Sequence, residues 1–153
     1  MIEISTYLRN SIGGFVAVDE IASYDGDPLY VEGALELTVN GVQLIDKSMW
    51  DYVDQLWAYL VQLVIEVRKA GRAEVLFPDQ PICLSIERVG KSDLLVRCEA
   101  GDGKRVARVS EEELSAAVER AAEGFFNSML VLIPQNRHGY EYELQRAKSL
   151  RPR

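Results

Sequence analysis

The chain has 153 residues, of which 48% are apolar and 27% charged. This length predicts a single domain over residues 1–153. The composition is that of a globular protein, which excludes a disordered chain, a collagen-like fibre and a coiled-coil rod. The formal net charge is −7, from 24 acidic and 17 basic residues.

This charge is distributed unevenly along the chain. Residues 1–66 hold eleven acids and only two bases, Arg9 and Lys47, whereas residues 67–153 hold thirteen acids and fifteen bases. Phosphates would be repelled by the first part, so nucleic acid is not expected as a partner. The acidic part is either ordinary solvated surface or a surface that meets a basic partner, since charge of one sign steers association with the opposite sign.

No segment predicts secretion or membrane insertion. The N-terminal residues lack a basic region followed by an apolar stretch, so no signal peptide is expected. The densest apolar run, residues 56–65, is too short to span a bilayer. Cys83 and Cys98 could form a disulfide between strands, but two free thiols are the favoured interpretation. We therefore expect a cytoplasmic protein that does not bind membranes.

The first part of the chain predicts strands followed by a long helix. Alternating apolar residues predict a strand over 2–8, and residues 15–18 follow a glycine turn as a second strand. A loop over 23–28 precedes the clearest alternation, residues 30–39. Asn40-Gly41 then suits the positive φ angles of a tight hairpin, which returns the chain along residues 42–45.

A wide apolar face predicts an amphipathic helix over residues 49–67. Ser48 is expected to cap this helix, with Asp51 at the position of the capping-box acid. Asp51 and Asp54 are also expected on the polar face of the helix, where an exposed stripe explains them. Gly71 is expected to end it.

The second part repeats this order. Strands are expected at residues 75–77, 82–87, 94–98 and 104–109. Ser110 and the three glutamates after it predict the start of a second long helix, which Pro134 ends. A loop over 135–139, a short final helix and a short basic tail, residues 146–153, complete the chain, and the tail is expected to fray.

Hairpin connections and the order of strands, long helix, strands, long helix predict an α+β fold. We expect a mostly antiparallel sheet with two long helices packed on one face, and a short helix after the second.

The sequence predicts no catalytic residues, no metal and no cofactor. His138 is the only histidine, and without a nucleophile elbow it is expected to be a solvated loop residue. Asp25-Gly26-Asp27 lacks the later ligands of a calcium loop. Gly101-Asp102-Gly103-Lys104 lacks the remaining residues of a P-loop and is expected to be a hairpin turn.

The chain contains the segment VEGALELTVNG at residues 31–41 and the segment PDQPICL at residues 78–84. The expected long helix lies between these two segments. A strand pair and a C-terminal helix follow the second segment. Over residues 30–132 this order resembles small bacterial proteins similar to immunity proteins, which neutralise toxins delivered between competing bacteria. The resemblance implies a cytoplasmic inhibitor that occludes a toxin domain and has no catalytic residues. An acidic inhibitor would suit a basic toxin, such as a nuclease.

Three hypotheses follow. The first is an immunity-type protein, a monomer or homodimer, that binds a basic toxin domain. Tyr7, Tyr24 and Tyr30 are candidate anchors in its acidic surface. The second is a small enzyme or ligand-binding domain with carboxylates or tyrosines in a pocket between sheet and helix. The third is an oligomeric structural protein, suggested by the wide apolar face over residues 49–67. The carboxylates expected to bind a partner in the first hypothesis are Asp19, Glu20, Asp25, Asp27, Glu32 and Glu36.

Overall fold

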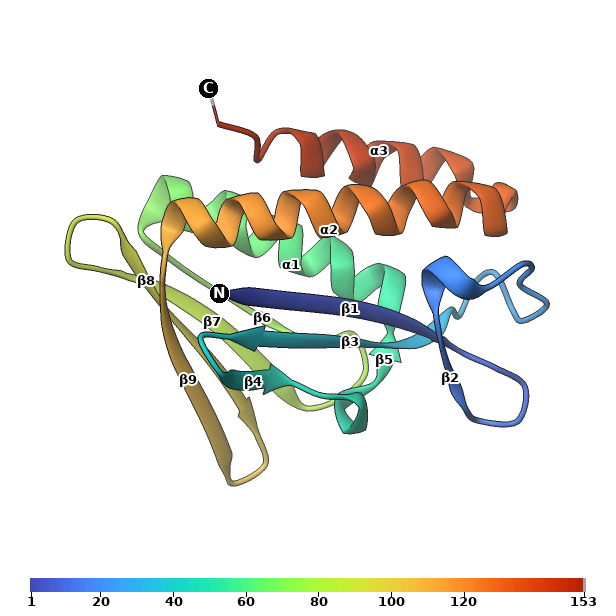
Figure 1. Ribbon diagram of the computed structural model, residues 1–153, viewed down its shortest axis with the longest axis horizontal. Coiled ribbons are helices and arrows are strands. Elements are labelled where there is room, and N and C mark those ends of the chain that lie inside the picture. The colour runs from blue at the N-terminus through green and yellow to red at the C-terminus, as the bar shows by residue number, and fades with distance from the viewer. Residues whose placement is uncertain (153) are drawn as a thin grey trace.

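A computed structural model describes residues 1–152 and confirms the α+β class, with antiparallel sheets and helices in the expected order (Figure 1). The first sheet has the strand order β2-β1-β3-β4, with β5 also paired to β3. Its strands are β1 (Ile2–Arg9), β2 (Phe15–Ala17), β3 (Glu32–Val39), β4 (Val42–Ile45) and β5 (Asp51–Tyr52). The second sheet consists of β6 (Arg72–Leu76), β7 (Ile82–Val89), β8 (Asp93–Ala100) and β9 (Gly103–Ser110), in chain order. The helices are α1 (Val53–Ala70), α2 (Glu111–Leu132) and α3 (Arg137–Lys148).

The strands form two sheets where the sequence led us to expect one. The strands after α1 pair only among themselves within the described residues, because each follows the last through a hairpin or short connection. The sheets meet where β4 and β9 lie side by side (Figure 1). There the Arg105 guanidinium lies 2.9 Å from the Asp46 carboxylate and 3.0 Å from the Gln43 carbonyl oxygen, and the Asn40 amide donates to the Arg108 carbonyl oxygen at 2.7 Å.

The wide apolar face of α1 is covered by other elements of the same chain. The helix packs against β6 and β7 of the second sheet, β3 of the first sheet, and α2. Trp57 is fully buried, stacks on Phe125 of α2 at 6.0 Å between ring centroids, and donates its indole N–H to the Thr6 hydroxyl at 3.0 Å. The apolar face that suggested an oligomer is therefore explained by packing inside one chain.

The start of α1 differs from the prediction. Asp46, and not Ser48, acts as a cap: its carboxylate accepts the Ser48 N–H at 2.9 Å at the start of a 3-10 turn. The chain then pairs briefly with β3 as strand β5 before α1 begins at Val53. Asp51, expected on an exposed helical stripe, is 3% exposed and lies in that strand. The prediction for Asp51 was wrong because a tertiary strand pairing replaced the first helical turn.

Other local signals are confirmed. Asn40 and Gly41 have φ angles of 48° and 85°, as the tight hairpin requires. Gly71 ends α1 with φ of 80°. The Ser110 hydroxyl accepts the Glu113 N–H at 3.0 Å, and α2 ends before Pro134.

The C-terminal segment differs from expectation in two ways. His138, expected in a loop, is exposed in the first turn of α3. The tail up to residue 152 does not fray: Leu150 is fully buried, and the Arg151 guanidinium lies 2.8 Å from Glu119 and 2.6 Å from Glu123. Arg153, the last residue of the predicted tail, lies outside the described residues. None of the helices described over residues 1–152 combines the length and apolar character needed to cross a membrane.

Cys83 and Cys98 are free thiols on adjacent strands. Cys83 is opposite Glu99, whereas Cys98 is opposite Leu84, so the two side chains point to different faces of the sheet and cannot bond without rearrangement.

Burial raises the pKa of Cys98 to about 11. We expect a thiol reagent at pH 8 to label the half-buried Cys83 in the native protein and Cys98 only after unfolding. Mass spectrometry of labelled peptides checks this, with Cys83→Ser as the control that should show no native labelling. Equal labelling of both thiols in the native state would contradict it.

Candidate functional site

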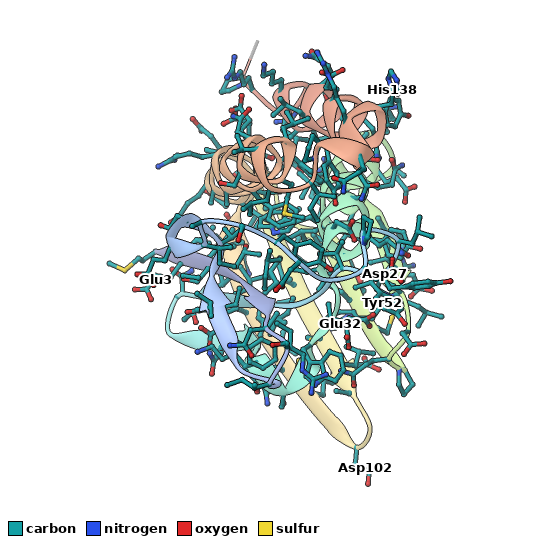
Figure 2. All side chains as sticks on the ribbon, turned by 90° about the vertical axis from the view of Figure 1, so that its right-hand side faces the viewer. Glu3, Asp27, Glu32, Tyr52, Asp102 and His138 are labelled. Carbon is teal, nitrogen blue, oxygen red and sulfur yellow. The ribbon has the colours of Figure 1, made fainter. Side chains whose placement is uncertain are left out.

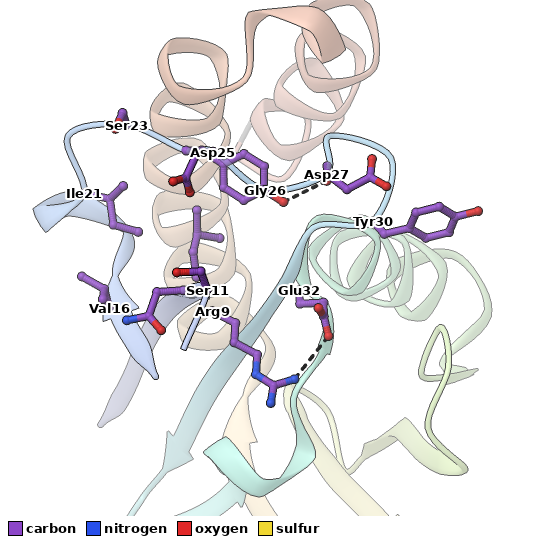
Figure 3. Close-up of a pocket in the computed structure, with 13 residues that line it drawn as sticks. Arg9, Ser11, Val16, Ile21, Ser23, Asp25, Gly26, Asp27, Tyr30 and Glu32 are labelled. Atoms are coloured by element: carbon purple, nitrogen blue, oxygen red, sulfur yellow. Dashed lines mark hydrogen bonds and ion pairs between the residues drawn. The ribbon is translucent and has the colours of Figure 1, made fainter. Parts of the chain in front are cut away.

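The loop between the 3-10 turn Val18–Glu20 and strand β3 forms one wall of a surface cleft of about 560 Å³ (Figure 3). The tip of the β1–β2 hairpin and the start of β3 form the other walls. Three of the carboxylates expected from the sequence line this cleft, Asp25, Asp27 and Glu32. The loop therefore brings together residues that the sequence separates by up to seven positions.

The loop is folded by its own hydrogen bonds. The Tyr24 hydroxyl donates to the Asp27 carbonyl oxygen at 2.8 Å, and the Asp27 carboxylate accepts the Leu29 N–H at 2.9 Å. Gly26 lies close to the Tyr24 ring: a Cβ there would lie 2.6 Å from the Tyr24 hydroxyl oxygen, so a larger residue would move the tyrosine side chain. Burial, and next the Asp27 charge, raise the pKa of Tyr24 above its ordinary value of 10.0.

Arg9 lies at the base of the cleft and belongs to both β1 and the site. Its guanidinium lies 3.3 Å from the Glu32 carboxylate (Figure 3) and stacks over the Trp50 ring at 4.1 Å. Lys47, the other base of residues 1–66, lies over the Tyr7 ring at 4.2 Å. Both bases are thus held against aromatic rings, Lys47 against Tyr7 of β1 and Arg9 against Trp50, which directly precedes β5.

A second cleft of about 270 Å³ adjoins the first, because Glu32 lines both. Trp50, Tyr52 and the exposed carboxylate of Asp79 also line it. The Tyr52 ring lies 5.7 Å from the Tyr30 ring of the first cleft. No local pattern in the sequence marks Tyr52 or Asp79, since strand β5 and the turn after β6 meet only in the folded chain.

Large apolar side chains are exposed around these clefts. Tyr30 is 57% exposed, its neighbour Leu29 73%, and Ile12 at the tip of the β1–β2 hairpin 90%. In Figure 3 the Tyr30 ring projects outward beside Asp27. We use the name acidic end for this surface; its members are Asp25, Asp27, Glu32 and Asp79 with Ile12, Leu29, Tyr30 and Tyr52.

The six predicted carboxylates do not all lie together. Asp19 and Glu20 are exposed on the 3-10 turn that leads into the loop. Figure 2 shows Asp27, Glu32 and Tyr52 together on one side of the molecule, far from Glu3, Asp102 and His138. Glu36 lies further along β3 on the outer face of the first sheet, where it accepts from the Gln43 amide at 3.2 Å.

Most acids of the first part lack a balancing base. Of the eleven acids in residues 1–66, only Glu32 and Asp46 form an ion pair with a described residue. Of the thirteen acids in the second part, eight form one. The net charge seen in the sequence therefore becomes unbalanced surface charge in the fold, and the acidic end carries much of it.

Asp54 behaves differently from the carboxylates of the clefts. It lies at the start of α1 and accepts a hydrogen bond from the Tyr140 hydroxyl at 2.9 Å. Burial raises its pKa above the ordinary value of 3.8, and the bond from Tyr140 opposes this only in part. Protonated Asp54 is therefore favoured more in the folded chain than in the unfolded chain.

Because the pKa of Asp54 is raised by folding, the stability of the protein should depend on pH. The stability due to Asp54 is fully present below its unfolded pKa and is lost as the pH rises through the higher folded pKa. We expect the wild type to lose stability relative to Asp54→Asn from pH 4 to 7, by at most about 1.4 kcal/mol per pH unit. Urea unfolding of both proteins across this range checks it; a constant difference would contradict it.

Acidic, aromatic and small polar side chains are prominent in the lining of the two clefts. Within residues 1–152 no group of three or more His, Cys, Asp or Glu side chains could hold a metal ion. The interface between the sheets and helices is filled by buried apolar side chains, and neither Asp54 nor Glu119, the carboxylates whose pKa is raised, lines either cleft.

The sequence matches no protein-family model, and comparisons with curated proteins and with solved structures return no match.

Proposed function

We propose that this protein is a cytoplasmic immunity-type protein that binds a basic toxin domain and occludes it. One observation carries the proposal: the acidic end combines the exposed carboxylates of Asp25, Asp27 and Asp79, which have no ion-pair partner among the described residues, with exposed aromatic and aliphatic side chains. The resemblance of residues 30–132 to immunity proteins gives the biological setting.

The composition of the acidic end suits a protein partner. Protein interfaces draw most of their binding energy from a few anchors, often Tyr and Trp, in surroundings that exclude water. Tyr30 and Leu29 offer such anchors, and Asp25 and Asp27 beside them would steer a basic partner into place. A toxin that acts on nucleic acid would carry the complementary basic surface.

A second candidate function is supported by one feature. The larger cleft has about 560 Å³, which is within the range of small-molecule sites. Because Asp25, Asp27 and Glu32 line this cleft, the alternative function is the binding of a small, positively charged molecule. We favour the protein partner because the Tyr30 ring projects outward (Figure 3) and its neighbour Leu29 is 73% exposed, so that a small ligand in the cleft would leave both uncovered.

The proposal is tested with the protein encoded beside this gene. We expect that protein to be basic, to arrest growth of a bacterial host when expressed alone, and to be neutralised and bound when both are expressed. A neighbouring product that has no toxicity and does not co-purify would overturn the proposal.

The acidic end is tested with charge-matched variants. Asp25→Asn together with Asp27→Asn should weaken binding of the toxin about tenfold at low salt, with a smaller effect at high salt, while the turn bond to Leu29 is kept. Asp102→Asn together with Glu112→Gln removes the same charge from exposed positions elsewhere and should change affinity less than about twofold. Equal effects of the two pairs would show that net charge alone matters.

A further inference from the structure

The side chain of Asn136, at the start of α3, forms a hydrogen bond to the loop of the acidic end. This residue occupies the N-cap position of α3, where an asparagine side chain commonly accepts an N–H of the first helical turn. Here its side chain makes no capping bond. Its amide instead donates to the Pro28 carbonyl oxygen at 2.6 Å and to the Tyr140 hydroxyl at 3.2 Å.

These contacts are part of a continuous chain of hydrogen bonds. The Tyr140 hydroxyl accepts from Asn136 and donates to the Asp54 carboxylate of α1 at 2.9 Å. Tyr140 is 4% exposed and its ring packs against Phe126 at 6.0 Å between centroids, so its hydroxyl is fixed in place. The chain Asp54–Tyr140–Asn136 therefore holds the middle of the loop, at Pro28, to two helices.

Pro28 lies between the residues that form the candidate interface. Asp25 and Asp27 precede it, and Leu29 and Tyr30 follow it. The loop has no regular secondary structure over residues 21–31. A loop of this kind loses conformational entropy when it binds, unless it is already ordered.

We infer that Asn136 and Tyr140 are positioning residues, which hold the loop in its binding conformation before a partner arrives. The ordering of the loop follows from the contacts alone, whereas its benefit to binding rests on the proposed function. Two helices far apart in the sequence, α1 and α3, thus act on the surface that the loop presents.

Amide exchange measured by NMR on the free protein tests the ordering. Leu29 and Tyr30 are the reporters, because their N–H groups bond to Asp27 within the loop, and Leu60 in the core of α1 reports global stability. In Asn136→Ser, which keeps a capping residue and changes no charge, we expect exchange at Leu29 and Tyr30 to rise about tenfold and exchange at Leu60 to stay unchanged.

Two further variants complete this test. Tyr140→Phe removes the hydroxyl that fixes Asn136 and should raise exchange at the same two amides about threefold; it decides the question if Asn136→Ser does not fold. Asn127→Ser, at an exposed position of α2, is the control and should change neither reporter. Exchange within twofold of wild type at Leu29 and Tyr30 in both test variants would overturn the inference, as would an equal rise at Leu60.

A hexa-arginine peptide tests the benefit to binding. We expect Asn136→Ser to weaken its binding about threefold without altering the salt dependence, because no charge has changed. Unchanged affinity together with faster loop exchange would overturn the role in binding. Failure of the wild type to bind the peptide at the loop would count against the proposed function, and the exchange rates would still decide the positioning role.

Discussion

Replacing Gly33 by alanine is expected to lower the free energy of unfolding by about 3 kcal/mol. Gly33 lies on β3 where β1 and β5 both pair with it, opposite Leu8 and Asp51. A Cβ at this position would lie 2.3 Å from the Tyr7 carbonyl oxygen and 2.7 Å from a methyl carbon of the buried Val53. The first of these atoms belongs to the backbone of the sheet, so the strands would have to separate.

Gly124 provides the matched control for this prediction. It lies within α2, is exposed, and a Cβ there would meet no atom within 4 Å beyond the neighbouring helix backbone. Gly124→Ala should raise the free energy of unfolding by about 1 kcal/mol, because alanine favours the helix over glycine. Urea unfolding of both variants measures the two effects. A Gly33→Ala protein as stable as wild type would show that the strands can separate at little cost.

The second large effect is expected at Asp51. Its carboxylate accepts the N–H groups of Asp79 at 3.1 Å and of Gln80 at 2.9 Å, and the Gln80 side chain donates to the Trp50 carbonyl oxygen. This carboxylate therefore fastens the turn after β6 to β5. Asp51→Ala should lower the free energy of unfolding by about 3 kcal/mol, since buried donors lose their acceptor.

Two comparisons separate the causes of that loss. Asp51→Asn keeps the size of the side chain but puts an amide N–H₂ group among N–H donors, so it should also be destabilising. Asp102→Ala, in an exposed turn, should change stability by less than about 0.5 kcal/mol. Urea unfolding measures all three, and amide exchange should rise first at Asp79 and Gln80 in the Asp51 variants. Full stability of Asp51→Asn would show that neither the charge nor the second carboxylate oxygen of Asp51 is needed.

Asp51 also matters for the proposed site. The turn that it holds contains Asp79, and β5 contains Tyr52. Both residues line the smaller cleft, and the hydrogen bonds of Asp51 fix their relative positions. The loop with Asp25 and Asp27 is held separately, through Asn136. The two halves of the acidic end therefore depend on different buried hydrogen bonds, and variants of one should leave the other ordered.

Local patterns predicted the fold class and most elements. Alternation of apolar residues marked β1, β3 and β7, the Asn40-Gly41 pair marked a hairpin, and Ser110 marked the start of α2. These predictions succeed because the interactions involve residues close in sequence. The sequence also showed that residues 1–66 are acidic, and the clefts lie within that part apart from Asp79 and Gln80.

Long-range contacts decided the rest. The division into two sheets depends on which strands meet after α1, and the burial of Asp51 depends on a turn 28 residues away. The ordered C-terminal segment depends on Arg151 meeting Glu119 and Glu123 across α2. In each case the partners are distant in sequence, so no local pattern carries the information.

The amino-acid sequence by itself determined the sign and location of the charge, the α+β class and the apolar faces, because composition and periodicity are properties of the chain. Only the tertiary structure decided which carboxylates share a surface. It joined Asp25, Asp27 and Glu32 with Tyr52 and Asp79 and separated Glu36 from them. The physical reason is that a shared surface requires distant segments to pack side by side, and that packing is set by the whole core.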